Sequence, residues 1–324
     1  MKSEILKMLL ENKTYVSGQK MCEELGVSRT AIWKTMNQLK EEGYRFESVT
    51  NKGYRIISCP DLLTKEAIEG SIKTKIIGKH IYYKKEVTST NTVAKQLAEE
   101  KGNHGLLVTA DMQSSGKGRR GRSWISPNGS GIWMSLILEP MLEPIHASML
   151  TLVAALAAAK GICEVTMLDA KIKWPNDIVV NKKKVCGILT EMNTELDYIN
   201  YVIVGIGINA NMQEFPEEIK QVATSLLIES GKQINRSVLI CKVMEYFELY
   251  YEAFIQKKDA SPFLEEYNMF LINRDKTVKI IGEEERIGVA KGINARGELL
   301  VMIDNQEIPI MSGEVSVRGL YGYV

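Results

Sequence analysis

Apolar residues recur with the three- and four-residue spacing of helices in residues 2–12, 17–26 and 28–43. Ser17 and Ser28 stand at the start of the second and third ranges, where a side-chain oxygen can cap a helix. A glycine ends each of these two ranges. Glycine suits a helix end because it tolerates the left-handed conformation that a helix end often needs. The pattern therefore predicts three helices at the beginning of the chain.

Two short runs of strand-forming residues follow the third predicted helix, at 44–49 and 54–57. The residues between them, 50–53, contain Asn and Gly and are typical of a hairpin turn. Three helices and a hairpin in this order predict a winged helix-turn-helix domain. The alternative is a small helical packing domain that binds no ligand.

The third predicted helix favours DNA binding, because residues 28–40 carry basic and polar side chains and no acid. An α-helix fits the DNA major groove, where Arg and Asn reach base edges. Trp33 is ambiguous, since it suits either the core or the DNA surface. The whole chain has 41 Lys and Arg against 40 Asp and Glu, which argues against a wholly basic nucleic-acid binder. The DNA-binding candidates are Ser28, Arg29, Thr30, Trp33, Lys34, Asn37 and, on the wing, Lys52.

The rest of the chain divides into two further domains. Strand and helix patterns alternate between residues 61 and 272, where 64–73 reads as a linker helix and 145–162 as an alanine-rich helix. The apolar run in that helix is too short to span a membrane. From 273 to 324 short strands are separated by turn residues, which predicts a small β-barrel. Residues 1–60 form the first domain.

Five widely spaced cysteines and the lack of a signal peptide predict a protein of the reducing cytoplasm.

The most distinctive segment is 114–124, with sequence SSGKGRRGRSW. It contains four cations, three glycines and no acid, so its backbone N–H groups and side chains suit an anion such as a nucleotide phosphate. The Gly-x-Gly-x-x-Gly spacing within it does not open a helix, so we reject a dinucleotide-binding fingerprint. A solvated basic loop is the alternative interpretation.

A second segment, 171–189, also carries candidate chemistry. Lys-Trp-Pro-Asn-Asp ends a predicted strand at Asp177, and the returning hairpin brings Lys184 toward the same end of the sheet. A charged hairpin tip is the alternative and suits Lys182 and Lys183. Lys184 differs because it adjoins an apolar run, so we expect its side chain to point inward.

Together these motifs resemble the biotin–protein ligases. Gly-Lys-Gly-Arg-Arg-Gly-Arg-x-Trp, Lys-Trp-Pro-Asn-Asp, Lys-x-x-Gly-Ile-Leu and Gly-Ile-Gly-Ile-Asn occur in the order seen in that family. With the winged helix in front, the whole chain is similar to the bifunctional biotin ligases and biotin-operon repressors of bacteria. The resemblance implies an α/β multidomain fold: a winged helix-turn-helix, a central α/β ligase domain like class II tRNA synthetases, and a C-terminal SH3-like β-barrel.

The resemblance also implies the reaction and its residues. Biotin and ATP are the substrates, with Mg²⁺, and biotinyl-5′-AMP passes biotin to a carrier-protein lysine. The implied catalytic residues are Lys184, Asp177 and Arg119, with Asp177 serving either Mg²⁺ or the incoming lysine. The implied biotin-binding residues are Ser89, Thr90, Asn91, Gln113, Gly116, Lys117, Gly118, Arg119, Lys184 and Gly187. The implied nucleotide-binding residues are Arg119, Arg120, Arg122, Trp124, Asn176, Asn209 and Arg318. Lys117 departs from the family, which often has Arg there; a lysine keeps the charge but lacks the bidentate fork of an arginine.

The resemblance implies three partners: a biotin carboxyl carrier protein, operator DNA and a second copy of the chain. The adenylate is the expected corepressor, and the strand 201–208 is expected to pair or pack across the two-fold axis.

Two other classes of protein remain open. A ligand-sensing regulator would bind the adenylate without turnover and would not need Lys184 or the 114–124 loop. A lipoate ligase would lack the winged helix.

Overall fold

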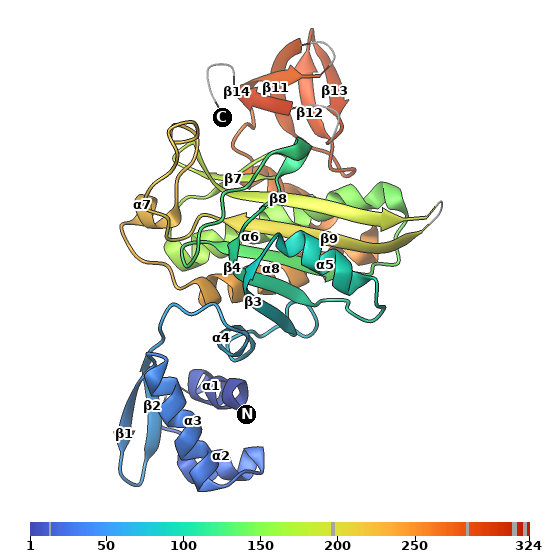
Figure 1. Cartoon of the computed structure of the whole chain (residues 1–324). Coiled ribbons are helices and arrows are strands. Elements are labelled where there is room, and N and C mark those ends of the chain that lie inside the picture. Colours follow the sequence, from blue (N-terminus) through green and yellow to red (C-terminus); the bar gives the residue numbers. More distant parts are fainter. Residues whose placement is uncertain (13, 196–197, 283–284, 313–315, 320–322) are drawn as a thin grey trace.

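A computed structural model describes the chain except residues 13, 196–197, 283–284, 313–315 and 320–322. A small helical domain lies at one end, a large sheet with helices occupies the middle, and a second sheet lies at the other end (Figure 1). The three-domain organisation therefore follows the order of the sequence.

The N-terminal domain has the predicted winged helix-turn-helix elements. Ser17 Oγ accepts a hydrogen bond from Lys20 N, and Ser28 Oγ accepts one from Ala31 N, so both serines cap helices as predicted. Gly26 ends the second helix with a φ of 65°. The elements are α1 (Lys2–Glu11), α2 (Gly18–Leu25), α3 (Arg29–Glu41), β1 (Arg45–Val49) and β2 (Gly53–Ser58). Their apolar faces form a separate core, which includes Ile5, Leu9, Met21, Met36 and Leu39.

The central domain is built on a seven-stranded sheet in the order β3-β4-β5-β9-β8-β7-β6. β3 and β4 pair in parallel and all other neighbours pair antiparallel. β9 is hydrogen-bonded to β5 on one side and to β8 on the other. Residues 202–208 are thus hydrogen-bonded on both sides within the sheet, so of the two expected contacts of 201–208 with a second copy, strand pairing is excluded for 202–208 and packing stays a prediction. The strands are β3 (Ile81–Val87), β4 (Leu107–Gln113), β5 (Ile132–Leu138), β6 (Lys171–Lys173), β7 (Asp177–Val180), β8 (Lys183–Thr194) and β9 (Ile199–Ile208).

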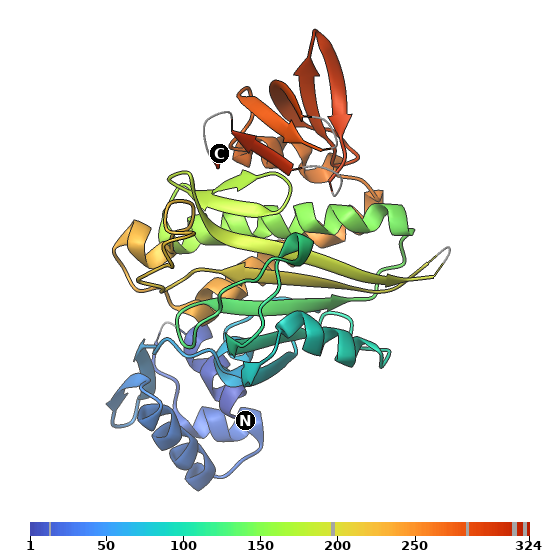
Figure 2. The same ribbon diagram turned by 45° about the horizontal axis from the view of Figure 1, so that its top comes forward.

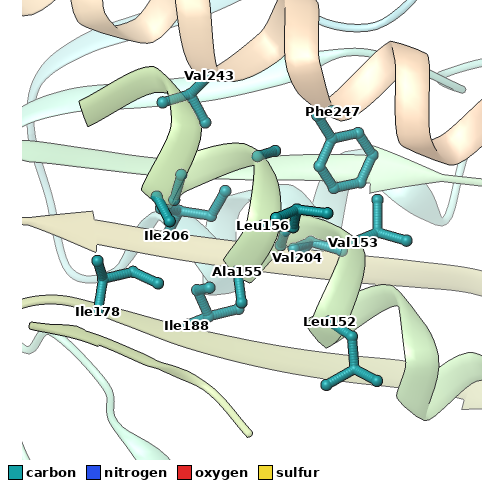
Figure 3. Close-up of a cluster of buried hydrophobic side chains, with 14 of the residues drawn as sticks. Leu152, Val153, Ala155, Leu156, Ile178, Ile188, Val204, Ile206, Val243 and Phe247 are labelled. Carbon is teal, nitrogen blue, oxygen red and sulfur yellow. The ribbon is translucent and has the colours of Figure 1, made fainter. Parts of the chain in front are cut away.

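Helices cover both faces of this sheet. α6 (Leu150–Thr166) and α8 (Arg236–Lys257) lie against one face, and α5 (Thr90–Ala98) lies against the other (Figures 1 and 2). Figure 3 shows Leu156 of α6 between Phe247 of α8 and strand residues such as Ile206. Alanines along α6 let the two helices approach closely. The main hydrophobic core therefore lies between the sheet and this helix pair.

The apolar helical segment is longer than the sequence alone indicates. A 3-10 turn, η2 (Pro144–Met149), runs directly into α6, and the whole segment Pro144–Thr166 is long and apolar enough to cross a membrane by composition. However, 67% of its most apolar window is buried inside the protein. Its hydropathy is therefore that of a core helix.

The C-terminal domain is a five-stranded antiparallel sheet in the order β13-β12-β11-β10-β14. In the described part of the chain β13 does not pair with β14, so the predicted barrel is not closed. The sequence does not predict β13, because this exposed edge strand contains two polar residues and Pro309. The sequence pattern predicts a last strand at residues 315–317, of which Val315 lies outside the described residues. The strands are β10 (Thr277–Ile281), β11 (Glu285–Ile293), β12 (Leu299–Ile303), β13 (Gln306–Ile310) and β14 (Ser316–Gly319).

The remaining helices are short. The linker helix α4 ends at Glu69, before the predicted end at residue 73, and packs between α1 and α8. The others are η1 (Arg119–Gly121), α7 (Leu226–Ser230), η3 (Ser261–Phe263) and α9 (Leu264–Phe270), with α4 spanning Lys65–Glu69.

A buried arginine ties the linker after the winged domain to the central sheet. Arg236, at the start of α8, is only 4% exposed. Its Nε donates to Asp61 Oδ2 at 2.9 Å, and its Nη1 donates to Asp111 Oδ1 at 2.9 Å. Asp61 precedes α4, whereas Asp111 lies on β4. One guanidinium therefore holds together three segments that are far apart in sequence.

We predict that Arg236→Ala lowers the free energy of unfolding by about 3–5 kcal/mol, because it leaves two partly buried carboxylates without their cation. Urea unfolding measures this change. Lys220→Ala is the control, since Lys220 pairs with Glu217 on the surface and such pairs contribute about 0–1 kcal/mol. Equal small losses in both variants would contradict the structural role of Arg236.

Candidate functional site

Three glycines leave a patch without side chains on the face of the central sheet that α5 covers. Gly187 of β8 pairs with Gly207 of β9, and Gly205 lies two residues before Gly207 on the same face. A Cβ atom at Gly205 would lie 2.2 Å from Asn91 Oδ1, and one at Gly207 would lie 2.6 Å from Trp124 Nε1. Only glycine leaves room here, so the patch forms the floor of a cavity.

The cavity over this patch has a volume of about 50 Å³. The structure brings nearly all the predicted biotin-binding residues to its wall. Gly116 is the exception: a Cβ there would lie 2.3 Å from the Trp124 carbonyl oxygen, so this glycine serves the packing of the loop. The predicted residues in the wall are Ser89, Thr90, Asn91, Gln113, Lys117, Gly118, Arg119, Lys184 and Gly187.

Polar groups at the start of α5 are fixed by hydrogen bonds to β4 and the loop. Gln113 Oε1 accepts from Thr90 N at 2.8 Å, and Gln113 Nε2 donates to Ser126 Oγ at 2.8 Å. Ser89, Thr90 and Asn91 are each less than 5% exposed. This part of the cavity therefore presents polar atoms in fixed positions.

Lys184 lies where this cavity meets a second, larger one. Its Nζ is 2.6 Å from Asp177 Oδ1 and 5.1 Å from the centre of the Trp124 ring. Asp177 is the first residue of β7, and Lys184 lies on β8, which pairs with it. The hairpin thus brings the two residues together at one end of the sheet, as the sequence predicted.

The second cavity has a volume of about 320 Å³ and is strongly basic. Burial lowers the pKa of Lys173 in its wall to about 8, although Asp177 opposes this shift. Burial also lowers the pKa of Arg119. All the predicted nucleotide-binding residues line this cavity: Arg119, Arg120, Arg122, Trp124, Asn176, Asn209 and Arg318.

The 114–124 loop is folded against the sheet. Arg119 Nη1 donates to Asn176 Oδ1 at 2.8 Å, and Trp124 N donates to the Gly116 carbonyl at 2.8 Å. The Trp124 ring lies over the glycine patch, and its buried Nε1 has no hydrogen-bond partner in the described part of the chain. Trp124 therefore lies between the two cavities.

Several residues of this site carry little or no signal in the sequence. Gly205 and Gly207 were recognised only as a motif, although strand alternation places both on one face. Lys173 was quoted in its motif without a role. Phe215 and Ile219 in the second cavity carry no local chemical signal, and Ser135 behind the first cavity is an ordinary strand residue.

The N-terminal domain carries the second candidate surface. Arg29, Thr30 and Lys34 are exposed on α3, as are its N-cap Ser28 and Lys52 on the hairpin, whereas Asn37 is half-buried. Trp33 is 59% exposed, which resolves its ambiguity in favour of the surface. A basic face of this kind, with an aromatic residue, is suited to DNA.

The fold and the site together define a biotin–protein ligase joined to a helix-turn-helix domain. Residues 83–209 match the biotin/lipoate A/B protein ligase family, 2–55 an HTH domain, and 275–318 the biotin protein ligase C-terminal domain. The chain belongs to the family of bifunctional biotin ligases and repressors.

Two relatives and one solved structure illustrate this membership. The chain is 39% identical to the bifunctional ligase/repressor BirA of Bacillus subtilis, over 99% of this chain and 98% of that protein. It is 30% identical to BirA of Escherichia coli, over 96% of this chain and 95% of that protein. The biotin protein ligase of Aquifex aeolicus in complex with biotin and ATP is similar, with a TM-score of 0.66 and 33% identity, over 74% of this chain and 99% of that one.

Proposed function

We propose that the protein joins biotin to ATP and then transfers biotin to a lysine of a biotin carboxyl carrier protein. The observation that carries this proposal is the position of Lys184 at the junction of the two cavities. The smaller cavity, with its fixed polar groups, takes the ring of biotin. The larger basic cavity takes the nucleotide.

In the first step a biotin carboxylate oxygen attacks the α-phosphorus of ATP, and pyrophosphate leaves. Lys184 neutralises charge on the carboxylate and the α-phosphate, and Arg119 assists from the loop. In the second step the carrier amine attacks the acyl carbon, AMP leaves with the carboxylate oxygen, and the amine loses a proton. The protein contributes mainly by positioning two anions, so it needs no covalent intermediate.

A magnesium ion fits this arrangement. Mg²⁺ is usually bound by one or two carboxylates together with substrate phosphates. Asp177 offers one carboxylate beside the basic cavity, and we propose that it holds the ion with the ATP phosphates. The ion would supply further neutralisation of phosphate charge.

The same protein is proposed to repress transcription in the cytoplasm. The exposed basic face of α3 would contact the operator, and biotinyl-5′-AMP would act as corepressor by favouring a homodimer. Packing through the side chains of β9 stays a proposal, since its edges are used within the sheet. A regulator without turnover is less favoured, because both Lys184 and the basic loop line the site.

We predict that Lys184→Ala slows formation of biotinyl-5′-AMP by about 10²–10³-fold, because it removes a preorganised cation from the reacting centre. Release of pyrophosphate in single turnovers measures this rate. Lys182→Ala is the matched control, since it removes one charge from the exposed tip of the same hairpin. A near wild-type rate in Lys184→Ala would rule out the assigned role.

We predict that the 114–124 loop opens in the free protein and closes over ligand. A cavity of about 50 Å³ is well below the roughly 300 Å³ of ordinary ligand pockets, so biotin requires the loop to move. Limited trypsin digestion followed by mass spectrometry tests this, because the loop contains four cleavage sites. Biotin with ATP should slow cutting in the loop and leave cutting at exposed Lys20 unchanged. Equal rates with and without ligand would contradict loop closure.

We predict that the adenylate strengthens both self-association and operator binding. One winged helix offers few phosphate contacts, whereas two copies on a dimer add their binding through effective concentration. Sedimentation and operator shift assays with and without biotinyl-5′-AMP measure the two effects. Lys34→Ala should dimerise normally but bind DNA more weakly. If the adenylate changed neither association nor DNA affinity, the coupling would be wrong.

A further inference from the structure

A chain of hydrogen bonds runs behind the first cavity and ends at a carboxylate outside it. Glu191 of β8 accepts from Asn91 Nδ2 at 2.7 Å and from Lys95 Nζ at 2.6 Å. Asn91 Oδ1 lies 2.6 Å from Ser135 Oγ, and Ser135 Oγ lies 2.7 Å from Thr90 Oγ1. Glu191 does not line the cavity, so any effect on a ligand must act through Asn91.

The carboxylate sets the orientation of the Asn91 amide. An ionised carboxylate only accepts hydrogen bonds, so Glu191 requires the NH₂ group of Asn91 to face it. The carbonyl oxygen of Asn91 then faces Ser135 and requires a donor. Ser135 has a single hydroxyl hydrogen and is fully buried, so this hydrogen is committed to Asn91.

Ser135 Oγ is placed to donate to Asn91 Oδ1 at 2.6 Å and to Thr90 Oγ1 at 2.7 Å, but it has one hydrogen for these two acceptors. Thr90 Oγ1 in turn donates to Gln113 Oε1 at 3.1 Å. When the Asn91 carbonyl oxygen takes the Ser135 hydrogen, that hydrogen no longer occupies Thr90 Oγ1. The lone pairs of Thr90 Oγ1 remain available as acceptors. Gln113 Oε1 is also an acceptor, because it receives the backbone N–H of Thr90.

The electrostatic surroundings support an ionised Glu191. Partial burial by itself would raise the pKa of this carboxyl group. Hydrogen bonds from Lys95 and Asn91, with the nearby charge of Lys117, hold the pKa below its ordinary value instead. Lys117, where the family often has Arg, thus has an electrostatic partner on β8.

We propose that Glu191 is a positioning residue that fixes the direction of this hydrogen-bond chain and so makes the pocket selective for ring N–H donors. The inference rests on the proposed function, since it takes biotin as the ligand. The ureido ring of biotin carries two N–H donors, whereas the dithiolane ring of lipoate carries none. A site built of buried acceptors binds the first and rejects the second, whose binding would leave those acceptors unpaired.

Glu191→Gln tests this proposal, because a glutamine amide can either donate or accept and no longer dictates the Asn91 orientation. We expect the dissociation constant for biotin to rise about tenfold, the loss typical of a hydrogen bond to a charged group. The preference for biotin over a biotin methylated on its ureido nitrogens should fall by a similar factor. The KM for ATP should stay unchanged. Calorimetry without ATP and steady-state kinetics give these values.

Two further variants make the test specific. Ser135→Ala interrupts the chain, so adding Glu191→Gln in that background should cause no further loss. Glu164→Gln is the control: Glu164 is a half-exposed, hydrogen-bonded glutamate on α6, and its replacement should leave biotin binding intact.

The proposal is overturned if Glu191→Gln binds both ligands like the wild type, or if the losses with Ser135→Ala are additive. It is also overturned if KM for ATP rises as much as that for biotin, since that would indicate a general structural role. A wild-type protein that forms no biotinyl-5′-AMP would instead refute the proposed function.

Discussion

The site depends on one constraint, the absence of side chains at three glycines in the middle of a fully paired sheet. Strands in such a sheet normally present a side chain at every second residue. Because Gly187, Gly205 and Gly207 present none, the face of the sheet is open to Asn91 from one side and Trp124 from the other. The rigid sheet then fixes the distance between these walls. The cavity is therefore a property of backbone geometry.

Charge is arranged around this cavity in two zones. Behind the wall of the first cavity, polar atoms form the hydrogen-bond chain that ends at Glu191. The Glu191 carboxylate is paired with Lys95. On the nucleotide side cations predominate, and Asp177 beside Lys184 is the carboxylate that faces them. Uncharged polar groups gather at the start of α5 and most cations gather at the second cavity, while Lys117 and Arg119 also line the first cavity and Lys184 lies where the two meet. The physical separation fits a reaction in which one substrate is recognised by its ring and activated at its carboxylate.

Local signals made much of the fold predictable. The caps at Ser17 and Ser28, and the glycine at 26, determine helix ends within a few residues, so the winged domain followed from the sequence. The meeting of Asp177 and Lys184 was predictable because a short hairpin joins them. By contrast, the chain through Ser135 and Glu191 joins residues 44 to 100 positions apart, and only the order of strands in the sheet brings them together. The missed strand β13 is an exposed edge whose stability comes from its neighbour.

The central claim is that biotin is activated at its own carboxylate in this site and then passed to a carrier amine. Turnover of biotin labelled with ¹⁸O in both carboxylate oxygens, with MgATP and a carrier domain, tests it most directly. Mass spectrometry should find one labelled oxygen in the phosphate of AMP and the other in the new amide of the carrier. Unlabelled AMP, or labelled biotin that never reaches the carrier, would contradict the account.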